Sequence, residues 1–387
     1  MTAPSVAVAG TGEFAGALVR ALARYPHPMR LHVLSGNPER ARDLAELAAD
    51  HGFLAGTRTS CTPHHIVPED ARQLRHTLAA VRPDVLVTAT SEQSPAEART
   101  APSAWTDLLG RAGFGLTLPL QAARVQRLAA ACADAGVDTL LVNACFPDAV
   151  NPLLRATGTP VVCGLGNVAT LAAALSTRLG LVDQRRLHLL AHHAHLHAPA
   201  NPDLDALGWL AGVQLPDLHG LLADVRRRPR QHLNEIGAVA GAAAVAALAG
   251  AGPAHVGHLP GPDGLPGGYP VTVGHGAVRL RLPDGLPLKQ AVAWNLRRSE
   301  LDGSVVEPDG TTRLMPDALA ALRAHWPDAP AVYRPRVLPF LHGELMRLRT
   351  RLRGIPSRRT PGAARGRGAL PPPHQSEPHR RPLRSPA

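Results

Sequence analysis

The feature that most constrains the fold is an apolar segment that ends in a glycine-rich turn near the N-terminus. Val6–Ala7–Val8–Ala9 is followed by Gly10–Thr11–Gly12 and then by the largely apolar residues 14–22. Gly10 permits a sharp exit from a strand, and Gly12 lacks a Cβ that would hold a pyrophosphate away from the backbone. A helix that starts there directs unpaired N–H groups and the positive end of its dipole toward phosphate oxygens. The stretch predicts dinucleotide binding, with these contacts: Gly10, Thr11, Gly12, Glu13 and Phe14.

The first half of the chain alternates strand-like and helix-like segments. A strand at 31–34 follows the first helix at the spacing of a βαβ unit. The predicted elements that follow are helices at 41–51 and 118–136, and strands at 85–90, 139–143 and 160–164. This alternation indicates an α/β fold with a doubly wound parallel sheet, the Rossmann arrangement.

The pattern changes after residue 160. Helices are predicted at 168–179 and 231–250, a strand at 187–197, and two short strands within 269–282 around Gly274–His275–Gly276. We therefore expect a dinucleotide-binding Rossmann domain over residues 1–160 and a second, α+β domain for substrate and catalysis over residues 161–346.

The net charge of +11 is concentrated in the last 41 residues. Residues 347–387 contain eleven Arg and one acid, so the rest of the chain is almost electrically balanced. The segment is also rich in Pro and Gly, and it cannot bury enough apolar surface to order itself. It predicts a disordered basic tail, either a solubilising extension or one that contacts nucleic acid or anionic membrane without specificity.

Targeting and redox signals are few. The first residues lead straight into a strand without the pattern of a signal peptide, and the Ala/Gly/Val-rich residues 236–252 indicate a buried helix rather than a membrane span. The four cysteines lack C-x-x-C spacing, which argues against a zinc knuckle or a disulfide framework. We expect a cytoplasmic protein with a small-molecule substrate and no specific nucleic-acid partner, and the pattern allows a homo-oligomer.

The end of the second strand bears on the choice of nicotinamide cofactor. An NAD site usually places Asp or Glu there, to accept a hydrogen bond from the ribose 2′-OH. Here Ser35 and Asn37 are neutral, Glu39 comes later, and Arg40 could face a 2′-phosphate. The pattern favours NADP, with NAD as the alternative if Arg40 is only a solvated residue of the following helix.

Polar residues at two further strand ends are candidates for the ligand crevice. Asn143 ends the strand at 139–143, and Asn167 follows a glycine turn. The carboxyl ends of parallel strands border the ligand crevice of a doubly wound sheet, where an amide suits a carboxamide or a substrate oxygen. Asn is equally a common turn residue, so a purely structural role is the alternative.

The densest cluster of ionisable side chains lies at residues 188–197. If this segment is a strand, His193, His195 and His197 share one face, since side chains alternate. Three imidazoles on one face could bind zinc, whereas a single His could act as a general acid or base. No H-E-x-x-H or C-x-x-C supports a metal, so we expect no metal site and favour His193 as a single catalytic residue.

The order of these segments resembles the lactate/malate dehydrogenase family. Gly10–Thr11–Gly12 looks like its pyrophosphate turn, Leu141–Val142–Asn143 is similar to the strand whose Asn lies beside the nicotinamide, and Leu190–Ala191–His192–His193 sits where that family has its catalytic His. Val87–Thr88–Ala89–Thr90 is similar to the family's fourth strand, so the resemblance adds Thr88 and Ala89 to the predicted cofactor contacts.

The resemblance also implies two departures. The family's substrate-binding Arg falls on Trp105, and the Asp that orients its His falls on Ala169. A 2-oxo acid needs a cation for its carboxylate, and a hydride-transfer His needs an anionic partner. Ordinary lactate or malate chemistry is therefore not expected. Residues 143–152 are also similar to the saccharopine dehydrogenase group, which couples a nicotinamide domain to amino-acid-derived substrates.

These observations favour an NAD(P)-dependent oxidoreductase acting on a small polar, amino- or keto-acid-derived substrate. The predicted catalytic residues are His193, Asn143 and Asn167. In addition to the contacts at the phosphates, the predicted cofactor contacts are Ser35, Arg40, Thr88, Ala89 and Asn143. Two alternatives stay open, a non-catalytic NAD(P)-binding protein and a His-cluster metal enzyme.

Overall fold

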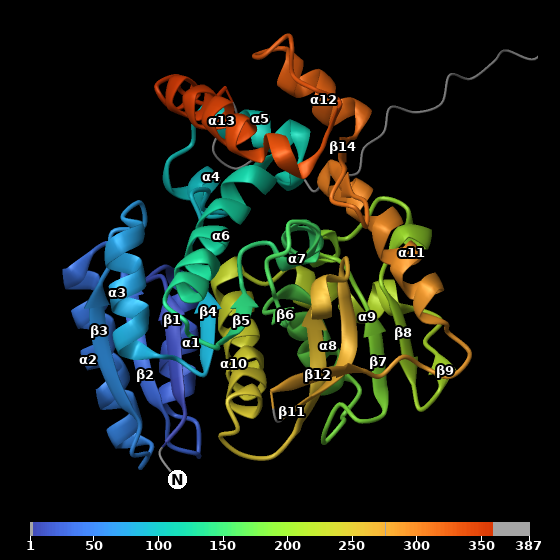
Figure 1. Ribbon diagram of the computed structural model, residues 1–387. Coiled ribbons are helices and arrows are strands. Elements are labelled where there is room, and N and C mark those ends of the chain that lie inside the picture. The colour runs from blue at the N-terminus through green and yellow to red at the C-terminus, as the bar shows by residue number, and fades with distance from the viewer. Residues whose placement is uncertain (1–2, 275, 359–387) are drawn as a thin grey trace, which may run out of the picture.

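A six-stranded parallel sheet runs from one edge of the molecule to its middle (Figure 1). In the computed structural model, which describes residues 3–274 and 276–358, its strands are β1 (Ser5–Ala9), β2 (Arg30–Ser35), β3 (Ser60–His65), β4 (Val85–Thr88), β5 (Leu140–Asn143) and β6 (Cys163–Gly164). They are ordered β3-β2-β1-β4-β5-β6, and every neighbouring pair is parallel. The order reverses between β1 and β4, as in a Rossmann sheet, so the predicted fold class is confirmed.

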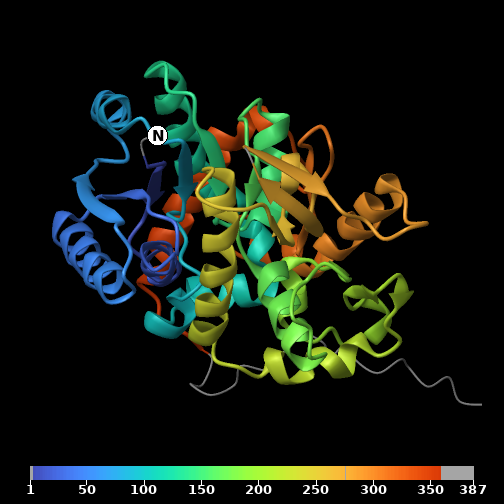
Figure 2. The same cartoon turned by 90° about the horizontal axis from the view of Figure 1, so that it is seen from below.

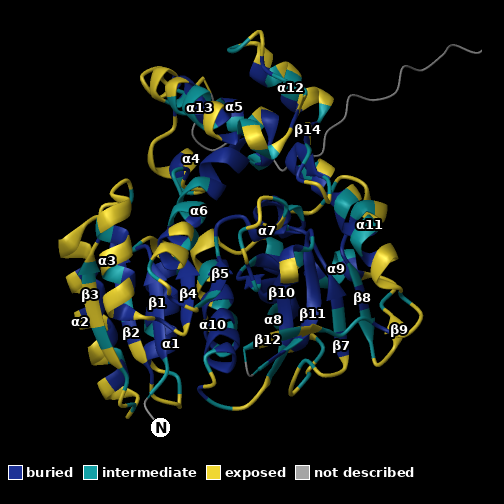
Figure 3. Ribbon diagram, in the orientation of Figure 1, coloured by how far each residue is buried: buried dark blue, intermediate teal, exposed yellow. Residues whose placement is uncertain are grey.

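Helices cover both faces of this sheet (Figure 2). One face carries α1 (Glu13–Ala23), α2 (Pro38–Leu54) and α10 (Arg230–Leu248), and the other carries α3 (Ala71–Val81) and α6 (Leu118–Asp134). Val6 and Val8 pack into the apolar cluster on the α1 side, whereas Ala7 and Ala9 pack into the cluster on the α6 side. Because alternate side chains point to opposite faces, a strand covered on both sides must be apolar throughout. Figure 3 shows the resulting contrast between the buried strands and the exposed outer sides of α2 and α3.

The C-terminal part of the described chain packs against the first half. It contains the helices α12 (Pro316–Arg323) and α13 (Leu338–Arg353), and the first half contains α4 (Glu97–Thr100) and α5 (Ala104–Ala112). The helix α13 packs on α5 and α6, near the carboxyl ends of the sheet strands (Figure 1). Its buried side chains recur at helical spacing, at Leu341, Leu345, Leu348 and Leu352.

This helix corrects the predicted start of the basic tail. Residues 347–353 belong to α13, and Leu348 and Leu352 continue its apolar stripe, so the expectation of disorder from residue 347 is wrong for residues 347–353. The rest of the predicted tail, from residue 359 onward, lies outside the described residues.

The second half contains three antiparallel sheets of three strands each within the described residues. The helices are α7 (Pro147–Ala156), α8 (Asn167–Arg178), α9 (Leu218–Arg226) and α11 (Leu288–Ser299). The strands are β7 (Leu187–Leu190), β8 (Leu207–Leu210), β9 (Val213–Gln214), β10 (His255–Pro260), β11 (Gly268–Gly274), β12 (Ala277–Leu280), β13 (Ser304–Val306), β14 (Thr312–Leu314) and β15 (Val332–Tyr333). The expected α+β character of this half is confirmed, while a domain boundary near residue 160 stays a prediction.

The predicted strand at 187–197 is wrong beyond Leu190. A 3-10 turn occupies His193–Leu196, because the backbone N–H of His192 donates to Nδ1 of His195 at 2.7 Å instead of to a neighbouring strand. A side chain that captures a nearby backbone donor competes with sheet formation in this way. The three histidines predicted to share a strand face therefore do not.

Candidate active site

The turn after β1 needs glycine at its first position. Gly10 has φ +128°, and a Cβ built on it would lie 2.5 Å from the carbonyl oxygen of Ala89. Its N–H donates to the carbonyl oxygen of Leu34 at 2.8 Å. The turn is thus held against the ends of the two neighbouring strands, and a side chain here would push β1 and β4 apart.

Gly12 meets a different requirement. It is the N-cap of α1, no side-chain hydrogen bond caps that helix within the described residues, and a Cβ on Gly12 would have none of their atoms within 4 Å. The open space belongs to a cavity that Gly12, Glu13, Phe14 and Ala15 line. Uncapped N–H groups at a helix N-terminus, reached without hindrance from a side chain, suit a phosphate ligand. The residues present therefore fit the pyrophosphate of a dinucleotide.

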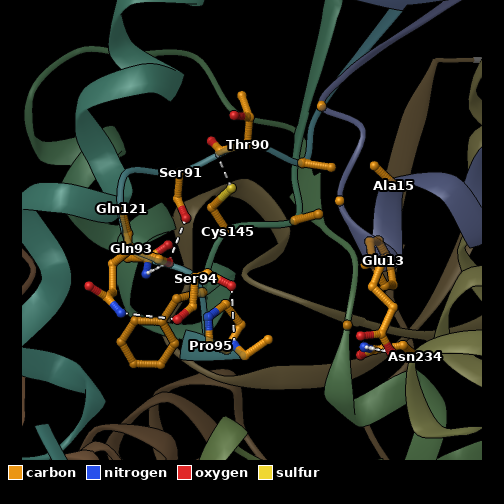
Figure 4. A pocket seen from close by; sticks show the side chains of 18 of the residues that line it. Glu13, Ala15, Thr90, Ser91, Gln93, Ser94, Pro95, Gln121, Cys145 and Asn234 are labelled. Atoms are coloured by element: carbon orange, nitrogen blue, oxygen red, sulfur yellow. Dashed lines mark hydrogen bonds between the residues drawn. The ribbon is translucent and has the colours of Figure 1, made fainter. Parts of the chain in front are cut away.

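The cavity has a volume of about 1240 Å³ and extends along the carboxyl ends of the sheet strands. Pockets for one drug-sized ligand typically have volumes of about 300–1,000 Å³, so this one has room for a cofactor and a substrate together. Figure 4 shows part of its wall, where Oε1 of Glu13 accepts a hydrogen bond from Nδ2 of Asn234 at 3.1 Å. The other carboxylate oxygen of Glu13 lies 3.5 Å from the guanidinium of Arg99, so side chains of α4 and α10 meet at the start of α1.

The end of β2 presents neutral groups to the cavity. Ser35, Gly36 and Asn37 line it, and the Ser35 hydroxyl lies 3.2 Å from that of Thr11. Arg40 is exposed outside the cavity lining, and its backbone N–H donates to Oδ1 of Asn37 at 2.9 Å. A contact between the Arg40 side chain and a 2′-phosphate stays a prediction.

Two of the predicted site residues lie inside the protein. Asn143 is 0% exposed, and its amide donates to Asn151 at 2.8 Å and accepts from the N–H of Cys145 at 2.8 Å. The Thr88 hydroxyl, also buried, lies 3.3 Å from Oδ1 of Asn143. Neither residue lines the cavity, whereas Ala89 does. The Asn143 amide thus bonds within the turn after β5 and to α7, and a role of Asn143 in catalysis or cofactor binding stays a prediction.

Asn167 does line the cavity. It is the first residue of α8, and its Oδ1 accepts a hydrogen bond from Arg230 at 3.4 Å. Arg230, the first residue of α10, is exposed to the cavity, and within the described residues no carboxylate lies within 4 Å of it. The pair thus offers a guanidinium and an amide to an anionic ligand.

His193 lines the cavity and has an acidic partner. Its Nδ1 lies 3.2 Å from Oδ1 and 3.1 Å from Oδ2 of Asp302. A carboxylate can only accept, so Nδ1 of His193 donates its hydrogen to Asp302, and Nε2 is the other ring nitrogen. The rings of Phe114 and Phe146 pack on the imidazole, with centroids 5.6 and 4.9 Å away. The ring is therefore held in one orientation with one nitrogen left for a ligand.

The protonation of two neighbouring groups follows from their surroundings. Burial raises the pKa of Asp302, but the His193 and His192 rings outweigh this and hold that pKa below its usual range. Burial raises the pKa of the Cys145 thiol to about 12, and the thiol donates to the carbonyl oxygen of Thr90 (Figure 4). Asp302 is thus a carboxylate, whereas Cys145 is a neutral thiol and no nucleophile at neutral pH.

The three histidines of the metal alternative have different surroundings. His195 is fully buried, and its ring bonds the His192 N–H and the Leu204 carbonyl oxygen. His197, in contrast, lines the cavity. In the part of the chain that the structure describes, no group of three or more His, Cys, Asp or Glu residues is placed to hold a metal ion.

Sequence reasoning missed Asp302, Arg230 and Asn234. The acid that the resemblance implied at Ala169 comes instead from residue 302, more than a hundred residues after His193, in a Glu-Leu-Asp-Gly turn that carries no motif. Arg230 had only a weak signal, since it stands directly before the Ala- and Gly-rich helix predicted at 231–250 but closely follows the basic run Arg226–Arg228.

Comparison with known proteins gives a distant match. No family model and no curated protein matches the chain. Among solved structures it is similar to MGS-M5, a lactate dehydrogenase enzyme from a Medee basin deep-sea metagenome library, at 15% identity and a TM-score of 0.48, covering 78% of this chain and 97% of that one. It is also similar to the minor L-lactate dehydrogenase from Enterococcus mundtii, at 15% identity and a TM-score of 0.44, covering 78% and 96%.

Both are lactate dehydrogenases, the family that the sequence resembles. The assignment of the Rossmann fold rests on the strand order of this chain itself. Among the described residues, no helix is both long and apolar enough to span a bilayer.

Proposed function

We propose that the protein is an NAD(P)-dependent oxidoreductase that acts on a small anionic substrate of amino- or keto-acid type. One observation carries the proposal. A single cavity has the uncapped N-terminus of α1 at Gly12 in one part of its wall and the His193–Asp302 pair in another. A phosphate-binding helix end and an oriented acid–base residue are the two parts that a nicotinamide enzyme must bring together.

The roles of the residues follow from their positions. The N–H groups after Gly12 would hold the pyrophosphate, and Ser35 and Asn37 would bond the adenosine ribose. The bound nicotinamide supplies or accepts the hydride. Nε2 of His193 would take the substrate proton during oxidation or return it during reduction, while Asp302 keeps the ring oriented.

The substrate charge is inferred from Arg230. This guanidinium borders the cavity without an acidic partner within 4 Å in the described residues, and the Asn167 amide lies beside it. A planar guanidinium binds a carboxylate through paired hydrogen bonds. The residue that the family resemblance matches to the substrate-binding Arg is Trp105, which cannot form them. Trp105 is instead buried and donates to Gln93 at 2.8 Å.

Replacement of Arg230 tests this role. Arg230→Leu is expected to raise KM for the carboxylate substrate about 100-fold, the loss of about 2.8 kcal/mol at 1.4 kcal/mol per tenfold, while NADPH binding is retained. Arg228→Gln is the control, because Arg228 lies two residues earlier and outside the cavity lining. Steady-state kinetics of both variants measure the effect. Equal KM values in Arg230→Leu and the wild type would rule out Arg230 as the group that binds the substrate carboxylate.

We also propose NADP as the preferred cofactor. The supporting observation is that no carboxylate lies among Ser35, Gly36 and Asn37, where the cavity wall meets the end of β2. Ser35→Asp is expected to reverse the preference, because the new carboxylate accepts from a ribose 2′-OH and repels a 2′-phosphate. Fluorescence titrations with NADPH and NADH measure both affinities, and a wild type that binds NADH more tightly contradicts the proposal.

Cofactor binding and metal analysis of the purified protein test the function as a whole. We expect saturable enhancement of NADPH fluorescence, no stoichiometric metal, and NADPH oxidation when keto acids, with or without ammonium, are supplied. NADPH binding without turnover of any such substrate would point to the non-catalytic alternative. Stoichiometric zinc with no dinucleotide affinity would refute the proposal.

A further inference from the structure

The carboxylate of Asp302 contacts two neighbouring imidazoles. Nδ1 of His192 lies 3.2 Å from Oδ2 of Asp302, and Nδ1 of His193 lies 3.1 Å from the same oxygen. His193 lines the cavity, whereas His192 is 0% exposed and has no part in the function proposed above. Because the carboxylate only accepts, Nδ1 of His193 donates a hydrogen bond to it, whereas Nδ1 of His192 lies at ion-pair distance from Oδ2 and also 3.4 Å from the N–H of Ala194.

A second buried carboxyl group lies near His192. Asp148, in the first turn of α7, is 1% exposed, and neither of its carboxyl oxygens has a hydrogen-bond partner in the described residues. Nε2 of His192 is likewise buried without a partner. Burial raises the pKa of Asp148, with a further increase from Asp302, against the opposing charge of the His192 and His193 rings. The three side chains Asp148, His192 and Asp302 thus form one buried cluster, which we call the inner cluster.

The charge of Asp302 must be balanced within this cluster or by His193. A buried ion without a partner is strongly unfavourable. The other titratable neighbours are neutral, since burial lowers the pKa of His195 to about 4 and raises that of Tyr269 well above 10. Burial lowers the pKa of His192, but Asp302 and Asp148 outweigh it and raise that pKa above its ordinary value.

We propose that His192 is a positioning residue that stays protonated, neutralises Asp302 and has Asp148 as its second carboxyl neighbour. His193 then gains or loses its proton without leaving Asp302 as an uncompensated buried charge. The role of His193 in this inference rests on the proposed function, whereas the charge of His192 does not.

The inference predicts the effect of removing the inner charge. In His192→Gln, Asp302 acts on His193 alone and favours its imidazolium form. A base needs a free lone pair, so the acid limb of the pH profile for substrate oxidation is expected to move to higher pH, by about one unit or more.

The charge of His192 can be measured on the ligand-free full chain. Ring ¹⁵N shifts followed by NMR, with the His192 signals identified by their loss in His192→Gln, are expected to show an imidazolium at pH 7. Asp148→Asn is expected to lower the titration midpoint of His192 by about one pH unit or more, because one of two carboxyl neighbours is lost. Asp263→Asn is the matched control, since Asp263 is exposed and pairs with the exposed Arg155.

A neutral His192 ring at pH 7 in the wild type overturns the inference, even if Asp148→Asn fails to fold. An unchanged midpoint in folded Asp148→Asn removes Asp148 from it, and an unshifted acid limb in His192→Gln overturns the positioning role. A chain without any turnover would instead contradict the proposed function, and the NMR titration would still decide the charge of His192.

Discussion

Gly12→Asp is expected to abolish dinucleotide binding while leaving the chain folded. The Cβ of the new residue has no protein atom within 4 Å, so the substitution fits the folded chain. Its carboxylate would occupy the space in front of the first turn of α1 and repel the pyrophosphate. We expect Kd for NADPH to rise at least about 100-fold, or about 2.8 kcal/mol at 1.4 kcal/mol per tenfold. Fluorescence titration measures Kd, and thermal unfolding reports the fold.

Two further glycine variants make this result specific. Gly12→Ala adds only a methyl group and is expected to weaken binding less than Gly12→Asp. Gly10→Ala is expected to lower the thermal unfolding temperature instead, because its Cβ would lie 2.5 Å from the Ala89 carbonyl oxygen at a φ of +128°. Wild-type affinity for NADPH in Gly12→Asp would mean that the pyrophosphate lies elsewhere.

His193→Gln and Asp302→Asn are each expected to lower kcat by about 10²–10⁴-fold with little change in NADPH affinity. The first variant removes the group that exchanges a proton with the substrate. The second keeps the shape of the partner but loses the charge that orients and stabilises the imidazole. Single-turnover measurements of the hydride step, followed by NADPH absorbance, separate this effect from product release.

The chain offers a matched control for this pair. His219 also has a carboxylate partner, with its Nδ1 2.7 Å from Oδ2 of Asp205, but it does not line the cavity. His219→Gln is therefore expected to leave kcat unchanged. If His193→Gln keeps the wild-type rate, the proton is exchanged by another group and the assignment of His193 is wrong.

Local sequence patterns sufficed for most strands of the sheet and for the glycine turn after β1. The continuous apolar strands, such as Val85–Thr88, can be predicted from the sequence because both faces of the sheet are covered. Gly10 and Gly12 can be predicted because a sharp turn and a close approach of a ligand to the backbone each need a residue without a side chain. The strand β3 escaped notice, since Ser60–His65 is polar, lies at the sheet edge and contains a proline.

Some of the predicted site residues line the cavity described above, namely Gly12, Ser35, Ala89, Asn167 and His193, and their roles there stay predictions. Asn143 and Thr88 do not, because a residue at the end of a strand can turn its side chain inward as readily as toward a ligand.

The sequence by itself determined the glycine turn for which we propose dinucleotide binding, because a strand, two glycines and a helix adjacent along the chain are enough to build it. Only the tertiary structure decided which side chains line the cavity next to that turn. Asp302 and Arg230 reach the cavity from a turn and a helix end far from His193 in the chain, and each was brought there by packing that no local pattern records. Catalytic pairs depend on distances of about 3 Å between atoms, and those distances are set by the fold as a whole.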